Sequence, residues 1–221
     1  LQCFPALIAK IPFTLYLGII SFVASMALAI VILIIRNSKI SVFRWFAELF
    51  VSFFRSTPYI TQLFIFYYGL PQLIPSLVNL SAETSFVISV ALNSSAFIVE
   101  ILRGGLLSVD KGQREAALSI GLNKFQVMTQ VVIPQAFVSI LPALGNTFVG
   151  AVKNTAIAFT IGVVEILSES KILAARGFNY MEAYIAAGIV YWILILAIDL
   201  VQKRLEKRAV SYTHLTLPTI R

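Results

Sequence analysis

The chain of 221 residues is 59% hydrophobic and 12% charged, with a mean hydropathy of +0.90, which is far more apolar than a soluble domain. A soluble fold of this length cannot hide so much apolar surface, so the chain needs the hydrocarbon of a membrane, which roughly 20 helical residues span. The net charge of +7 does not indicate a nucleic-acid partner, because the basic residues flank apolar runs and form no single stripe.

Five apolar runs are candidates for membrane-spanning helices. In chain order they are residues 13–35, 45–68, 85–102, 137–164 and 183–201. Pro71 and Pro75 lie in a loop after the second run, a polar segment at 103–130 follows the third, and a looser stretch of mixed charge at 165–182 precedes the fifth. The sequence predicts an all-α polytopic membrane protein with five transmembrane helices.

Orientation follows from the lysines and arginines, because basic residues near span ends are retained in the cytoplasm. Three of them fall on one side, namely Lys10, Lys171 and Arg176. Eleven fall on the other: Arg36, Lys39, Arg44, Arg103, Lys111, Arg114, Lys124, Lys203, Arg204, Lys207 and Arg208. We expect the N-terminus outside, and the 103–130 segment and the C-terminus in the cytoplasm.

The chain is expected to form one membrane domain with a short segment at each end. Residues 1–12 are predicted to be an extracytoplasmic N-terminal segment, and residues 13–208 the membrane domain with a cytoplasmic loop at 103–134. The chain starts at Leu1 and not at methionine, which suggests truncation. The tail at 209–221 is Thr- and Leu-rich, unlike anything before it, and is expected to be non-native.

Several kinds of chemistry lack their residues in this chain. Cys3 is its one cysteine and His214 its one histidine, so no metal site and no Ser-His triad are expected. No Gly-x-x-x-x-Gly-Lys-Ser/Thr loop is present to hold the phosphates of ATP. We therefore expect a transport subunit and not an enzyme, and any ATPase must be another polypeptide.

The cytoplasmic loop carries the most specific pattern in the sequence. It reads Glu115-Ala116-Ala117, three residues, Gly121, nine residues, and then a Val-Val-Ile run that ends at Pro134. This resembles the EAA loop of bacterial ABC importer permeases, whose pattern is Glu-Ala-Ala, three residues, Gly, nine residues, Ile-x-Leu-Pro. The two departures are conservative.

Local physics agrees with that resemblance. Residues 113–120 are rich in helix formers, and Gly121 suits the turn that ends a helix. Small side chains at Ala116 and Ala117 would let a partner surface approach closely, and Glu115 adds a charge that could set the register. The alternative is an ordinary surface helix that connects two spans.

The resemblance implies a fold, a location and partners. The fold is that of a type I ABC importer permease (MetI-like), in a bacterial cytoplasmic (inner) membrane. The cytoplasmic loop would be a coupling helix in a groove of an ABC ATP-binding subunit, which would hold ATP and Mg; no cofactor is expected in this chain. An extracytoplasmic amino-acid-binding protein would deliver substrate, and a second permease subunit, identical or not, would complete a dimer surrounded by membrane lipid.

Further stretches resemble the polar amino acid permeases, of the histidine, glutamine, arginine and cystine type. They are Arg55-Ser56-Thr57-Pro58 and the runs 62–64, 68–71, 95–105, 141–146, 153–157 and 161–163. Ser56 and Asn154 depart from that pattern, which commonly has Gly and Asp at these places. Because Asn154 cannot pair with a cation, substrates with a cationic side chain are disfavoured. The amino-acid sequence of residues 153–163 is similar to that of the cystine-type branch.

Charges inside a membrane span are costly, so their default interpretation is functional. Arg55 and Lys153 are such charges, and each adjoins helix-weakening sequence, Pro58 in the first case. They would supply donors for the carboxylate of an amino acid. Neutral hydrogen-bonding residues join this predicted substrate path: Thr57, Gln62, Asn154 and Thr155.

The alternative is structural, with each cation paired to a buried acid, either Glu48 or Glu100, or extended to the interface. Glu100 and Arg103 lie three residues apart on one helical face, where a structural salt bridge is expected. The rival function is a self-sufficient secondary transporter or channel. Proton coupling would favour acids deep within spans, whereas Glu48, Glu100 and Asp199 lie near span ends.

Overall fold

The computed structural model describes residues 3–177 and 179–216, and all regular structure within them is helical. The α-helices are α1 (Phe4–Ala9), α2 (Ile11–Arg36), α3 (Ser41–Ser56), α4 (Tyr59–Phe64), α5 (Leu70–Leu73), α6 (Ala82–Ser108), α7 (Lys111–Ser119), α8 (Lys124–Gln126), α9 (Ile133–Asn154), α10 (Ile166–Gly177) and α11 (Tyr180–Thr216). Two π-helices, η1 (Ile65–Gly69) and η3 (Val127–Val132), and two 3₁₀-helices, η2 (Pro75–Asn79) and η4 (Thr155–Ile161), link some of them.

Four helical segments of the described chain are long and apolar enough to cross a membrane. They are Phe4–Arg36, Ala82–Ser108, Lys124–Ile161 and Tyr180–Ala209. The prediction of an all-α polytopic membrane protein is confirmed. The predicted count of five continuous spans is wrong, because residues 45–68 do not form one helix.

The second predicted span is broken at Pro58. The ring of a proline disfavours the helical conformation for the preceding residue, and Thr57 is extended accordingly, with φ −111° and ψ 146°. The helix before the break, α3, has 16 residues, too few to cross a membrane, and α4 starts after it at Tyr59. Arg44, Glu48 and Arg55 also lower the hydropathy of α3.

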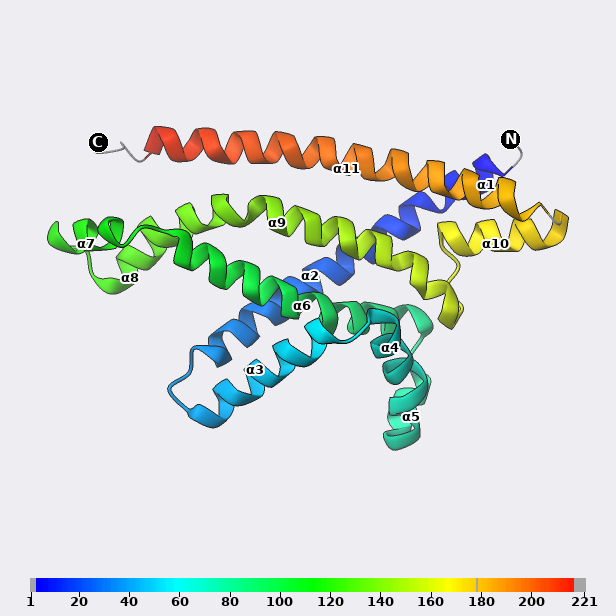
Figure 1. Cartoon of the computed structure of the whole chain (residues 1–221), viewed down its shortest axis with the longest axis horizontal. Helices are drawn as coiled ribbons and strands as arrows, with labels where there is room; N and C mark the ends of the chain where they lie inside the picture. Colours follow the sequence, from blue (N-terminus) through cyan, green and yellow to red (C-terminus); the bar gives the residue numbers. More distant parts are fainter. Residues whose placement is uncertain (1–2, 178, 217–221) are drawn as a thin grey trace.

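Helix α6 occupies the centre of the bundle, between α3 and α9, and it also contacts α2 (Figure 1). Phe86 and Val90 on α6 are fully buried and pack with Leu17 of α2 and Ala151 of α9. Many other buried positions of α6 are small, which lets neighbouring helices approach closely. They are Ser85, Ser89, Ala91, Ser94, Ser95, Ala96 and Gly105.

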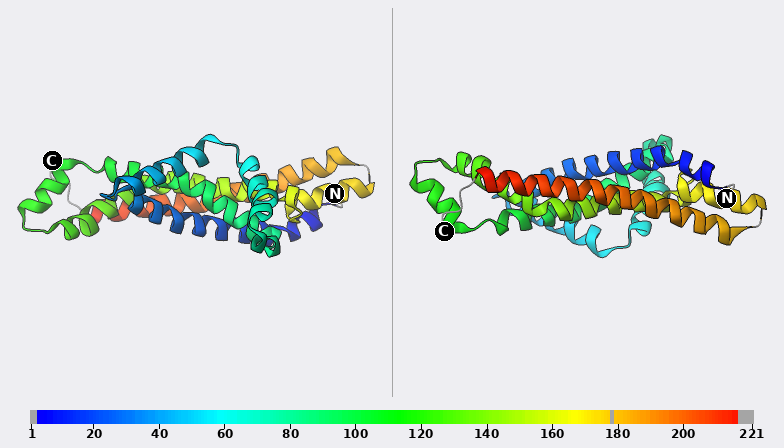
Figure 2. Two further views of the ribbon diagram at one scale, coloured as in Figure 1. Left: turned by 90° about the horizontal axis from the view of Figure 1, so that it is seen from below. Right: turned by 90° about the horizontal axis from the view of Figure 1, so that it is seen from above.

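The bundle is elongated, and its two ends differ (Figures 1 and 2). Helices α7 and α8 and the end of α11 lie at one end of the long axis, whereas α1, α10 and the start of α11 lie at the other. The turn from α2 to α3 lies toward the first end. Within the polar 103–130 segment, residues 103–108 complete α6, and the rest forms the helix–turn–helix of α7 and α8 at this end of the bundle.

Two predicted boundaries need correction. The fourth apolar run, predicted at 137–164, starts earlier as α9 and becomes the 3₁₀-helix η4 at Thr155. The stretch 165–182 is not loose, because it contains α10. Glu165 begins that helix: its carboxylate accepts a hydrogen bond from the backbone N–H of Ser168 at 3.0 Å, as an N-cap does.

The predictions for the two ends of the chain are only partly covered by the structure. Within the predicted N-terminal segment 1–12, residues 4–9 form α1, while residues 1–2 lie outside the described residues. The backbone of 209–216 continues α11. Residues 217–221 of the tail expected to be non-native also lie outside the described residues.

Candidate functional site

A cavity of about 620 Å³ opens between α3, α6 and α9. Its lining mixes amides, hydroxyls and charged groups, and it consists of Arg55, Asn93, Ser94, Phe97, Glu100, Ile101, Asn146, Thr147, Gly150 and Asn154. Most ligand sites combine a concave surface with a few convergent polar groups in this way. We take this cavity as the candidate substrate site.

Glu100 joins three helices at the charged end of the cavity. One carboxylate oxygen accepts a hydrogen bond from Arg36 of α2, and the other accepts from Arg103 of α6 at 2.9 Å. Arg55 of α3 lies farther away, with Nη1 4.0 Å from the carboxylate. The expected Glu100–Arg103 salt bridge is present, and Glu100 is the acid that Arg55 faces.

Of these three arginines, Arg55 lies farthest from Glu100 and is the one that does not hydrogen-bond to it. Its side chain is 45% exposed, and its guanidinium lies over the ring of Phe97, 5.8 Å from the ring centroid. Three cations share one carboxylate, so the cluster carries surplus positive charge. An anion that enters the cavity would meet that charge first at Arg55.

Thr57, Pro58 and Gln62, all predicted for the substrate path, lie at the break between α3 and α4. The side-chain amide of Gln62 donates to the carbonyl oxygens of Phe54 and Thr57, at 3.0 and 3.1 Å, and to Thr57 Oγ1 at 2.7 Å. Its own carbonyl accepts from Asn93 Nδ2 at 2.9 Å. These bonds satisfy the carbonyls that the break leaves unpaired.

The remaining residues of the predicted substrate path lie in different places in the structure. Asn154 lines the cavity together with Arg55. Thr155 is buried, and its hydroxyl donates to the carbonyl of Val152 at 2.7 Å. Lys153 is exposed and does not belong to the cavity lining.

Sequence reasoning missed several residues that line the cavity, most clearly Asn93, Asn146 and Thr147. For the wall of the cavity formed by α9, the spacing of residues in the sequence indicated the lining. Asn146, Gly150 and Asn154 recur every four residues along α9, which places them on one face of a helix. Polar and small residues on one face of an apolar helix indicate a wall that does not contact lipid.

The predicted coupling segment forms α7, a turn and α8. Asp110 caps α7 by accepting from the backbone N–H of Gly112 at 2.7 Å, and Asn123 forms a capping box with Gln126 at α8. Gly121 has φ +89°, a left-handed conformation that ends a helix and favours glycine. Leu122 N–H then bonds back to the carbonyl of Ala117 at 3.2 Å.

The turn presents an apolar tip. Ile120 is 79% exposed and Phe125 75% exposed, so two large apolar side chains project from this end of the molecule. Glu115 and Ala116 are exposed as well. Ala117, expected to present a small surface to a partner, instead packs inward, because it lies on the opposite face of α7.

The inward face of α7 is tied to the bundle. Ala117 belongs to a buried cluster with Val109, Val127, Val132 and Ala136. Arg114 of α7 donates to the backbone carbonyl of Leu106 in α6. Pro134 lies in the first turn of α9, directly after the π-helix η3. A push on α7 would therefore reach α6 and α9 directly.

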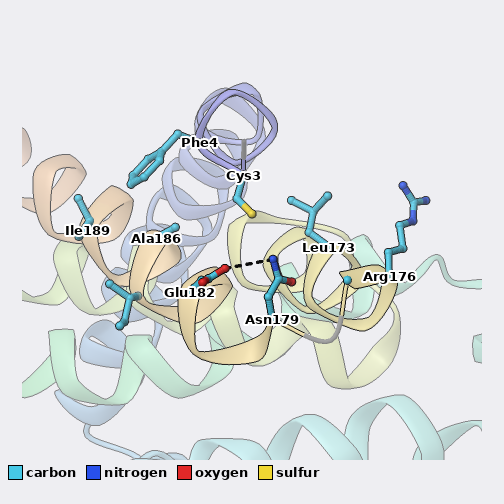
Figure 3. A pocket seen from close by; sticks show the side chains of 10 residues that line it. Cys3, Phe4, Leu173, Arg176, Asn179, Glu182, Ala186 and Ile189 are labelled. Carbon is cyan, nitrogen blue, oxygen red and sulfur yellow. Dashed lines mark hydrogen bonds between the residues drawn. The ribbon is translucent and has the colours of Figure 1, made fainter. Parts of the chain in front are cut away.

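A second cavity, of about 700 Å³, lies at the opposite end of the molecule among α1, α10 and the start of α11 (Figure 3). Its polar side chains include Asn179, which donates to Glu182 at 3.3 Å, and Arg176, which extends away from that pair. None of the predicted site residues lines it. Within residues 3–177 and 179–209, no group of three or more His, Cys, Asp or Glu is placed to hold a metal ion.

Comparison with known proteins shows which family the chain matches. The model of binding-protein-dependent transport system inner membrane components matches residues 25–211. Several similar proteins come from Bacillus subtilis, among them YxeN, ArtQ and TcyB. The probable amino-acid permease protein YxeN is 40% identical over 98% of this chain and 96% of its own length. The arginine transport system permease protein ArtQ is 34% identical over 94% of this chain and 97% of its own length. The L-cystine transport system permease protein TcyB is 37% identical over 94% of this chain and 88% of its own length.

A solved structure extends the similarity to three dimensions. A chain from the crystal structure of an amino acid ABC transporter with histidines superposes with a TM-score of 0.85 at 33% identity. The match covers 92% of this chain and 94% of that one.

Proposed function

Because the chain belongs to the family of binding-protein-dependent transport system inner membrane components, as an amino-acid ABC transporter permease, we propose that it forms the path for a polar L-amino acid and couples this path to a separate ATPase. The cavity between α3, α6 and α9 carries the first half of this proposal. The exposed tip of the α7–α8 turn supports the second.

The lining of the cavity favours a zwitterion with an uncharged polar side chain. Arg55 offers a guanidinium that Glu100 holds only at 4.0 Å, which suits the carboxylate of an amino acid. The opposite wall offers the neutral groups Asn146, Thr147 and Asn154. The lining's one acid, Glu100, already bonds to two other arginines, so a substrate side chain that is cationic finds no free carboxylate.

Cystine fits this description, since it is polar and carries no cationic side chain beyond its amino-acid groups. The permease of an L-cystine system and that of an arginine system are similarly related to this chain. The choice therefore depends on Asn154, which stands where the pattern of the polar amino acid permeases commonly has an aspartate that could pair with a cationic substrate. Cystine or another neutral polar amino acid is our proposed cargo.

The coupling proposal depends on an apolar tip held on a rigid base. Ile120 and Phe125 would enter a groove on the ATP-binding subunit, and Gly121 lets the chain turn between them. Because α7 is packed against α6 and α9, movement of the ATPase would shift the walls of the cavity. Alternating access of the path would result.

The placement of the basic residues supports an orientation with α7 in the cytoplasm. Lys111 and Arg114 on α7 lie at the same end of the molecule as the basic turns of α11 (Figure 1). The opposite end, with α1 and α10, would then receive substrate from an extracytoplasmic binding protein. The open side of the cavity would be closed by a second permease subunit.

One reconstitution tests the whole proposal. The chain is incorporated into liposomes with its ATP-binding subunit and its binding protein, and ATP hydrolysis is measured with cystine, glutamine, histidine or arginine outside. We expect neutral polar amino acids to stimulate hydrolysis and to be taken up. Uptake by the chain alone, without ATP, would instead identify a self-sufficient transporter.

A further inference from the structure

A groove on the outside of the bundle belongs neither to the cavity nor to the coupling segment. It has a volume of about 320 Å³ and lies between α2, α9 and α11. Apart from Gln202, its lining is apolar: Phe22, Met26, Phe137, Leu141, Leu144, Gly145, Phe148, Ile198, Val201 and Leu205.

The polar group of Gln202 is turned into the protein and not into the groove. Its amide donates to the carbonyl of Pro142 at 3.3 Å and to Glu206 Oε1 at 2.8 Å. A Cβ at Gly145 would lie 2.1 Å from Gln202 Cδ, so the Gln202 amide packs directly on the backbone of α9 at Gly145. The groove thus presents hydrocarbon alone, which excludes a polar ligand inside it.

The groove opens toward the membrane. Its residues on α9 and α11 lie within two of the membrane-spanning segments, and Phe137, Val201 and Leu205 are 51%, 56% and 53% exposed. Figure 1 shows α11 running beside α9, while α2 crosses them at an angle and diverges toward the end that holds α7. This divergence leaves the groove open on that side.

Helix α11 becomes basic where the groove ends. Arg204 follows Val201 by three residues, and Arg208 follows Leu205 by three, so each lies one turn beyond an apolar lining residue on nearly the same face. Both are exposed, as are Lys203 and Lys207 beside them. The ion pairs of the described part of the chain involve none of these four.

We propose that this groove is a binding site for an anionic phospholipid. One acyl chain lies along the apolar lining, and Arg204 and Arg208 bind the headgroup phosphate. The acyl chain requires the dry wall, and the anionic headgroup is selected by charges placed at the membrane surface. An apolar lining alone, or basic residues alone, would not distinguish this site from ordinary lipid contact. On α11, however, the basic residues follow the apolar lining residues on one face of the helix.

Fluorescence quenching in the assembled transporter tests this site. Trp45 and Trp192 are replaced by phenylalanine, and Phe137→Trp places one reporter in the groove wall. The complex is reconstituted in phosphatidylcholine bilayers with either brominated phosphatidylglycerol or brominated phosphatidylcholine at increasing fractions. We expect half-maximal quenching at a fraction of phosphatidylglycerol on the order of tenfold lower than that of phosphatidylcholine.

A pair of charge variants provides the control. Arg204→Gln with Arg208→Gln should abolish the preference for phosphatidylglycerol, whereas Lys39→Gln with Arg44→Gln, which removes the same charge near the same end, should keep it. Equal quenching by the two lipids would mean ordinary lipid contact and overturn the proposal. Absence of quenching by both would overturn it too, because it would mean that protein covers the groove. Quenching needs no substrate, so it is independent of the proposed transport function.

Discussion

At the scale of single residues, the three arginines around Glu100 are held differently. Arg36 and Arg103 bond directly to the carboxylate, whereas Arg55 stands 4.0 Å away with a half-exposed side chain. Exposed ion pairs of this kind contribute about 0–1 kcal/mol to stability. Loss of Arg55 should therefore leave the fold intact and affect only what enters the cavity.

We predict that Arg55→Gln weakens substrate binding without reducing the amount of protein in the membrane. A charge-assisted hydrogen bond to a carboxylate contributes about 1.5–3 kcal/mol, so the KM of substrate-stimulated ATP hydrolysis should rise by roughly tenfold or more. Arg44→Gln, on the same helix but outside the cavity, is the control and should keep the KM of the native chain. Equal KM values for the native chain, Arg55→Gln and Arg44→Gln would show that Arg55 does not bind substrate.

Glu165 is a buried acid outside the spans. Its carboxylate accepts hydrogen bonds from Tyr191 Oη and from the backbone of Ser168. Burial raises the pKa of Glu165, and these hydrogen bonds oppose the rise only in part. Because folding favours the protonated form, the contribution of Glu165 to the free energy of unfolding is greatest at low pH and falls as pH rises from the ordinary carboxyl pKa of 4.5 toward the raised value.

Glu165→Gln should remove that pH dependence, because glutamine never ionises; its Oε1 can still accept from the Ser168 N–H, and its amide N–H can donate to Tyr191 Oη in place of the bond that Tyr191 gives to the carboxylate. We expect the variant to melt a few degrees higher than the native chain at about pH 8, with the difference shrinking toward about pH 5. Thermal unfolding of the purified protein in detergent measures this. A difference that stays constant with pH would show that Glu165 does not titrate in this range.

At the scale of helices, the break between α3 and α4 depends on two amides from different elements. Pro58 predicts the break, and sequence reasoning identified Gln62 as a polar group beside it. The sequence could not show that Gln62 bonds to Asn93, 31 residues away, because a contact between two helices leaves no local pattern. For that reason Gln62 was predicted as a substrate residue, although its hydrogen bonds stabilise the break.

Replacement of Gln62 by leucine should destabilise the protein. Asn93 Nδ2 and the carbonyl of Phe54 would keep their own hydrogen bond of 3.1 Å, but the Thr57 carbonyl would lose its side-chain amide donor, and a buried polar group without a partner costs about 1–3 kcal/mol. We expect lower yield and a lower melting temperature in detergent. The matched control is Gln72→Leu, which removes an exposed glutamine bonded only to the nearby Tyr68 carbonyl; an equal loss in both variants would argue against the role of Gln62.

The turn after α7 makes a second prediction at this scale. Gly121→Pro is incompatible with φ +89° and removes the N–H that bonds to the Leu118 carbonyl, so the tip formed by Ile120 and Phe125 should be misplaced. We expect uptake to be lost while the chain still reaches the membrane. Uptake assays and immunoblots of membranes measure the two effects.

A second coupling variant and a control variant complete this experiment. Glu115→Lys, on the exposed side of α7, should likewise abolish uptake. Gly104→Ala, within α6 where an added Cβ meets nothing within 4 Å, should transport normally. Normal uptake by both Gly121→Pro and Glu115→Lys would contradict the coupling proposal.

At the scale of the whole molecule, the arrangement of charge was the most predictable property. Lysines and arginines that are distant in sequence lie at a common end of the structure (Figure 1). The apolar runs likewise predicted the long helices, because hydropathy over 20 residues is a strong signal. Helix α10 was missed, since it is short, carries mixed charge and is stabilised by contacts with α11 rather than by its own pattern.

Orientation is tested by labelling from one side of the membrane. In a Cys3→Ser background, Lys39→Cys marks the turn between α2 and α3, and Val78→Cys marks η2, where Val78 is 66% exposed. An impermeant maleimide should label residue 78 in right-side-out vesicles and residue 39 only in inverted ones. The reverse pattern would place α7 outside the cell and rule out its contact with a cytoplasmic ATPase.

The broken second span has a consequence for how the chain is made. Helix α3 is too short and too charged to leave a translocation channel for lipid by itself, and Glu100, the acid facing Arg55, is synthesised some 45 residues later. The ribosome must therefore complete much of α6 before α3 has its partner. Helix α3 would wait beside the channel until α6 emerges, and the two would enter the bilayer as a pair.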